Sequence, residues 1–96
     1  MERKSVIMTK VGDKFYSNFI QKKDSAMLFT FGNNTAVEGA VSVQFRIYDT
    51  VEPVTHNESL TLDANKESDF ISFQGQKGIE VRLVSTVELK NVKLLY

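Results

Sequence analysis

The chain has 96 residues, the size of one domain, with an apolar fraction of 42% and a charged fraction of 25% that are ordinary for a soluble globular protein. It has no cysteine, which excludes disulfides, thiolate metal sites and a cysteine nucleophile. Its formal net charge is zero, and this disfavours nucleic acid as a partner, because proteins that bind phosphates carry a positive balance. We therefore expect a single domain over residues 1–96.

The N-terminal apolar segment, residues 6–8, is shorter than the roughly 7–15 residues of a signal-peptide core. No apolar run approaches the roughly 20 residues that cross a bilayer. We expect a soluble protein made in the cytoplasm, with no membrane partner.

The first strand is predicted over Ser5–Lys10, and a second over Lys14–Ile20. Alternation along the second strand places Phe15 and Phe19 on one face and Tyr16 on the other.

Ser25–Phe31 is apolar at nearly every position, which is typical of a central strand. Residues 32–35, Gly-Asn-Asn-Thr, predict a turn, because Gly and Asn tolerate positive φ. The clearest strand is Val41–Tyr48, in which apolar side chains alternate with polar or amphipathic ones.

Residues 49–58 form the longest polar break and hold the single proline. Four further strands are predicted in the second half of the chain: Ser59–Leu62, Phe70–Phe73, Ile79–Val84 and Val87–Leu95. Asn91 interrupts the alternation of the last strand and indicates a β-bulge.

About eight short strands with turn residues between them, and no amphipathic helix, predict an all-β antiparallel sandwich of the jelly-roll kind. A small β-barrel is the alternative. Lysines at Lys4, Lys10, Lys90 and Lys93 are predicted to guard edge strands against unwanted pairing.

Three side chains are candidate binding residues: Tyr16, Tyr48 and Arg46. Tyrosine joins an apolar body to a polar tip, which suits contact with a sugar ring or a partner protein. Tyr48 and Arg46 share the outward face of their strand.

Oxygen-bearing side chains at alternate positions resemble the start of a calcium loop: Asp63, Asn65, Glu67 and Asp69. Ser68 stands where that loop needs glycine, and Gln74 where it needs a bidentate glutamate. We therefore predict a solvated acidic turn with no metal, and a hard cation as the alternative.

His56, the single histidine, lies in a polar stretch that predicts an exposed loop, with no nucleophile or orienting carboxylate beside it. We predict a protein that is not an enzyme and needs no cofactor. Basic residues are interleaved with aromatic ones within residues 1–23. The third hypothesis is therefore a small barrel that binds single-stranded nucleic acid.

Residues 1–48 carry seven basic and four acidic side chains, whereas residues 49–96 carry five and eight. Opposite patches of this kind steer head-to-tail contact between subunits. The leading hypothesis is a module for protein–protein interaction or assembly that binds protein subunits, with a homo-oligomer as one arrangement and an accessory protein of a phage virion or tail as one setting. The alternative is a carbohydrate-binding sandwich.

Overall fold

The structure, a computed structural model, describes residues 3–23, 26–47, 52–75 and 77–95. These residues form ten antiparallel strands in two sheets, and among them no helix is long and apolar enough to span a membrane. The strands are β1 (Arg3–Ser5), β2 (Met8–Val11), β3 (Lys14–Ser17), β4 (Ile20–Gln21), β5 (Met27–Asn33), β6 (Gly39–Arg46), β7 (Val54–Leu62), β8 (Asp69–Phe73), β9 (Glu80–Ser85) and β10 (Leu89–Leu95).

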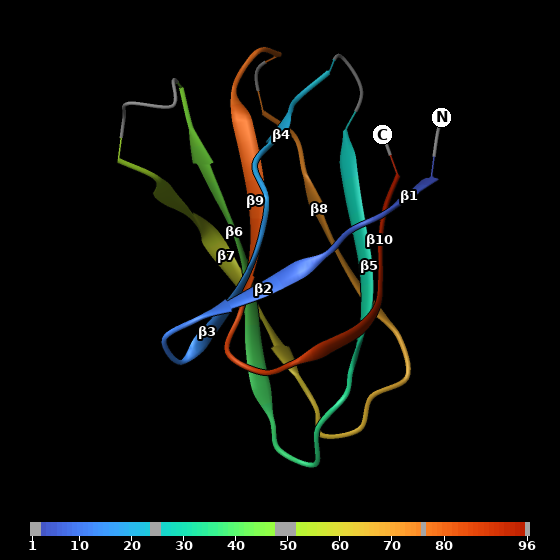
Figure 1. Ribbon diagram of the computed structural model, residues 1–96. Helices are drawn as coiled ribbons and strands as arrows, with labels where there is room; N and C mark the ends of the chain where they lie inside the picture. The colour runs from blue at the N-terminus through green and yellow to red at the C-terminus, as the bar shows by residue number, and fades with distance from the viewer. Residues whose placement is uncertain (1–2, 24–25, 48–51, 76, 96) are drawn as a thin grey trace.

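The four-stranded sheet has the order β1-β10-β5-β8, and the six-stranded sheet has the order β2-β3-β9-β6-β7, with β4 also paired to β9. From β7 to β10 the chain passes to the other sheet after every strand, which is the jelly-roll form of a sandwich. Figure 1 shows β6, β7 and β9 on the left and β5, β8 and β10 on the right. The predicted sandwich is confirmed.

The core lies between the sheets and follows from the alternation of each strand. On β6, Val41 and Val43 are buried, and on β9, Val81 and Leu83 are fully buried. The four-stranded sheet contributes Met27, Phe29 and Phe31 of β5 and Leu94 of β10 to the same cluster. Because side chains on a strand alternate between faces, the even-numbered residues of β6 and β9 lie on the outer face of the six-stranded sheet.

The predicted strand Ser5–Lys10 is wrong, since the structure divides this segment between the two sheets: β1 ends at Ser5 and β2 begins at Met8. Between them, Val6 packs against the core, and its backbone N–H donates to the carbonyl oxygen of Val92 at 3.0 Å. Val6 therefore contributes to the core at the point where the chain changes sheets.

The turn predicted at residues 32–35 begins too early. β5 continues through Asn33, which is 1% exposed, and neither Gly32 nor Asn33 has a positive φ. The side-chain amide of Asn33 donates to the carbonyl oxygens of Val37 at 2.8 Å and Asp63 at 3.0 Å. Asn33 is therefore not a turn residue: its buried side chain joins two loops through hydrogen bonds to their backbone.

Two further expectations about strands are corrected. His56 does not lie in a loop, because it falls within β7, which begins at Val54 and ends at Leu62. The register of β7 with β6 shifts between Thr55 and Ser59. Lys93 does not guard an edge, because β10 lies between β1 and β5 there and Ser5 is its partner on β1; β1 does not extend as far as Lys90. The predicted bulge at Asn91 is confirmed by a register shift between β10 and β5 and by its φ of 54°.

Candidate recognition face

Two cross-strand pairs occupy the outer face of the six-stranded sheet. The register of β6 and β9 sets Arg46 opposite Glu80 and Gln44 opposite Arg82. Arg46 Nε donates to Glu80 Oε1 at 2.9 Å, and Arg82 Nε donates to Gln44 Oε1 at 2.8 Å. Two guanidinium groups therefore lie on adjacent rows of one sheet face, each held by a different acceptor.

A one-residue bulge adds aromatic rings to this face. Tyr16 pairs with Val84 and Ile20 pairs with Val81, so three residues on one strand oppose two on β9. Ser17, buried at the bulge, accepts the backbone N–H of Leu83 through its hydroxyl at 2.8 Å. The extra residue inverts the alternation, so that Phe19 and Tyr16 come to the same face.

The predicted placement of Phe19 beside Phe15 is therefore wrong. Both Tyr16 and Phe19 contact the guanidinium of Arg82, at 4.4 and 4.7 Å from Cζ to the ring centroids. Phe15 lies on the opposite side of β3, where Lys10 is its cross-strand partner.

The ring of Phe19 joins the two arginines. Arg46 Cζ lies 3.7 Å from its centroid, and Arg82 Cζ lies 4.7 Å from it. A guanidinium stacked on an aromatic ring is attracted by the ring quadrupole, by about 0.5–2 kcal/mol depending on exposure. We call the group formed by Tyr16, Phe19, Gln44, Arg46, Glu80 and Arg82 the arginine–aromatic face.

The two arginines differ in their electrostatic surroundings. Arg46 has a carboxylate partner in Glu80, whereas Arg82 has none among the described residues. Burial away from water lowers the pKa of Arg82; Tyr16 acts in the opposite direction, and Arg46 lowers it further. At neutral pH Arg82 still carries its charge, so this face holds a partly desolvated cation that has no carboxylate partner among the described residues.

The structure brings together two of the three candidate binding residues, Tyr16 and Arg46, through Phe19 and Arg82. Tyr48 lies outside the described residues. Sequence reasoning missed Phe19 and Arg82 as members of the group. The alternation of its strand did place Arg82 on the outward face. The sequence did not reveal that this strand pairs with the strand of Arg46.

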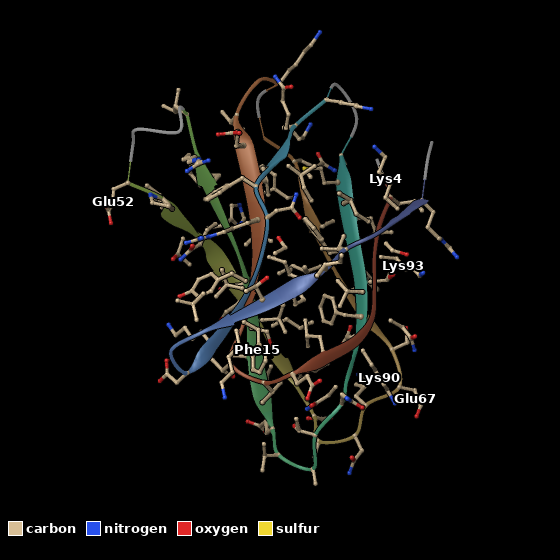
Figure 2. All side chains as sticks on the ribbon, viewed as in Figure 1. Lys4, Phe15, Glu52, Glu67, Lys90 and Lys93 are labelled. Carbon is tan, nitrogen blue, oxygen red and sulfur yellow. The ribbon has the colours of Figure 1, made fainter. Side chains whose placement is uncertain are left out.

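Two acidic side chains of the segment after β7 form ion pairs with lysines. Glu67 Oε1 lies 3.0 Å from Lys90 Nζ, and Asp69 Oδ2 lies 3.3 Å from Lys66 Nζ; Figure 2 shows Glu67 and Lys90 side by side. Among the described residues no three His, Cys, Asp or Glu side chains gather as a metal site. The alternative of a hard cation bound by Asp63, Asn65, Glu67 and Asp69 stays a prediction.

An apolar cleft of about 290 Å³ opens at one end of the sandwich. Its described lining is Phe45, Ile47, His56, Phe73, Gln74, Gly75 and Ile79. The ring of His56 packs edge-on against Phe73, with centroids 5.3 Å apart. The cleft has the character of a receptor for one apolar group, and it offers far fewer hydrogen-bonding groups than the arginine–aromatic face.

A comparison with protein-family models, with curated proteins and with solved structures finds no match to this chain.

Proposed function

We propose that this protein is a non-enzymatic module for protein–protein recognition that binds its partner through the arginine–aromatic face. The observation that carries the proposal is the stack in which Phe19 lies against the guanidinium groups of Arg46 and Arg82. Arginine and aromatic residues, tyrosine among them, dominate the binding energy of protein interfaces. On this face the two arginines are already held by hydrogen bonds and the rings are stacked against them, so little side-chain entropy is lost on binding.

A carbohydrate ligand is the second candidate, favoured by the ring of Tyr16 beside the polar groups of Gln44 and Glu80. Sugar rings bind best to an aromatic ring whose face is open. Arg82 covers Tyr16, and Arg46 covers Phe19 at 3.7 Å. The covered rings favour a protein partner over a neutral sugar.

The test is site-specific photo-crosslinking in an extract of cells that naturally make the protein. A benzophenone side chain replaces Thr55, which is exposed and lies opposite Gln44. The matched control replaces Ser72, which is exposed on the four-stranded sheet. We expect a discrete protein adduct from position 55, lost on Phe19→Ala, and none from position 72.

Adducts from position 72 alone, or adducts from position 55 that survive Phe19→Ala, would contradict the proposal. Light scattering at low and high salt tests whether the partner is a second copy of the chain; a salt-sensitive oligomer identifies it. Binding of neutral glycans on an array, lost on Tyr16→Ala, would instead establish the carbohydrate function.

A further inference from the structure

We propose that Arg82 is the receptor for a carboxylate on an acidic segment of the partner protein. This inference rests on the proposed function and names the chemistry of the partner at the same face. It starts from the difference between the two arginines: Glu80 neutralises Arg46, and no described carboxylate neutralises Arg82. A carboxylate supplied by the partner would give Arg82 the kind of ion pair that Arg46 already forms with Glu80 in the neighbouring cross-strand pair.

The charge on the arginine–aromatic face selects a monoanion. Two guanidinium groups and the carboxylate of Glu80 leave one positive charge. A carboxylate of charge −1 balances it. A phosphate monoester carries about −1.5 to −2 at neutral pH and would meet repulsion from Glu80.

The position of the guanidinium favours a forked contact. Its Nε is held by Gln44 Oε1 at 2.8 Å, and the amide nitrogen of Gln44 donates in turn to Thr55 Oγ1 at 3.4 Å. The rings of Tyr16 and Phe19 support its plane. The two Nη groups make no hydrogen bond with the described residues, and such a pair matches the two oxygens of a carboxylate.

Because Arg82 is partly buried, a bound anion would stabilise its charge more than it would stabilise the charge of an exposed arginine. Loss of water and the neighbouring charge of Arg46 both lower the pKa of Arg82, so the free protein holds this charge at a cost. A carboxylate bound at the Nη groups would relieve both effects, because it supplies hydrogen-bond acceptors and opposite charge together.

The experiment is an NMR titration of the ¹⁵N-labelled chain at low salt, with two five-residue peptides as probes. One is acetyl-Glu-Ser-Glu-Ser-Glu-amide, and the other carries glutamine at the three glutamate positions. We expect the Nε–H signal of Arg82 and the backbone amides of β6 and β9 to shift and saturate with the acidic peptide. The neutral peptide should bind at least tenfold more weakly.

Three variants sharpen the test. Arg82→Gln should abolish the acidic-peptide shifts, and the dispersed spectrum of the same sample reports whether the variant is folded. Arg82→Lys keeps the charge but loses the fork, so we expect binding about tenfold weaker than wild type. Lys10→Gln, the control, removes one charge from the opposite side of the same sheet and should bind within twofold of wild type.

Equal binding of the two peptides, or acidic-peptide binding unchanged by Arg82→Gln, would overturn the inference. Tighter binding of glucuronic acid or of inorganic phosphate than of the acidic peptide would overturn the assignment of the ligand as peptide. The two proposals fail separately. If photo-crosslinking at position 55 depends on Phe19 but survives Arg82→Gln, the recognition function stands and the carboxylate receptor does not.

Discussion

At the scale of single residues, buried polar side chains decide how the loops of this sandwich join. Asn33 is 1% exposed, and both ends of its amide group are used. Its nitrogen donates to the carbonyls of Val37 and Asp63, and its oxygen accepts the N–H of Thr35 at 2.9 Å and its hydroxyl at 2.7 Å. One side chain therefore ties two backbone segments, the loop after β5 and the segment that follows β7, to the end of β5.

Replacing this amide by a carboxylate of the same shape should be strongly destabilising. In Asn33→Asp, the partly buried carbonyl oxygens of Val37 and Asp63 lose the Asn33 donor and face an acceptor instead. The new carboxylate is itself buried, and the oxygen that replaces the amide nitrogen lacks the donors that would compensate its charge; a buried polar group that loses its partner costs about 1–3 kcal/mol, or more when it is charged. We expect the free energy of unfolding at pH 7 to fall by about 3 kcal/mol, measured by urea denaturation.

The neighbouring Asn34→Asp is the control, because it makes the same charge change at an exposed position. It should alter the free energy of unfolding by no more than about 0.5 kcal/mol. Similar losses in the two variants would show that charge, and not the hydrogen bonds of Asn33, sets the effect.

At the scale of elements, the bulge between β3 and β4 creates the arginine–aromatic face. Without its extra residue Phe19 would follow Phe15 to the inner side, as strict alternation predicts. Ser17 stabilises the bulge because its hydroxyl accepts a hydrogen bond from the N–H of Leu83, which would otherwise be buried without a partner. The arrangement of the arginine–aromatic face thus depends on a serine that is not a member of it.

The start of β6 shows how closely two elements approach. A Cβ added to Gly39 would collide with both methyl groups of Val87, which is 7% exposed. We expect Gly39→Ala to destabilise the protein by about 1–3 kcal/mol through overpacking.

A double-mutant cycle checks the cause of that loss. Val87→Ala removes the two methyl groups and costs stability alone, but the added methyl of Gly39→Ala fits the space that they leave. The double variant should be more stable than the sum of the single losses predicts, with a coupling of at least about 1 kcal/mol. Strict additivity would mean that the cost at Gly39 has another origin.

At the scale of the whole molecule, the fold is closed by its two ends. β1 pairs with β10 so that Arg3 lies opposite Leu95 and Ser5 opposite Lys93. Five of the seven other strand pairs among the described residues also join distant segments of the chain, and the exceptions are β2–β3 and β6–β7. The chain must therefore close long loops before its native contacts form.

This topology predicts slow folding. Sandwiches dominated by distant pairings fold in about milliseconds to seconds, whereas domains with local contacts reach microseconds. We expect stopped-flow refolding from urea to give a main phase in the slower range. Relaxation complete within microseconds would contradict this expectation and indicate a folding nucleus built from local hairpins.

The sequence by itself determined the strand class, most strand positions and the inward face of β6 and β9, because alternation is a local property that burial then enforces. It also determined the bulge at Asn91, since a polar residue interrupted an otherwise regular pattern. Arg46 and Tyr16 were within reach as candidates for the same reason: each occupies an outward position of its strand.

Only the tertiary structure decided which strands are neighbours, and with that the candidate site. Arg46 and Arg82 are 36 residues apart in the sequence, and they meet over Phe19 because β6 and β9 pair in one register out of several that alternation allows. The bulge at Ser17 inverted the face of Phe19, an effect that residue periodicity cannot reveal. Pairing between strands is chosen by the packing of the whole core, so a site built across strands forms only when the chain has folded.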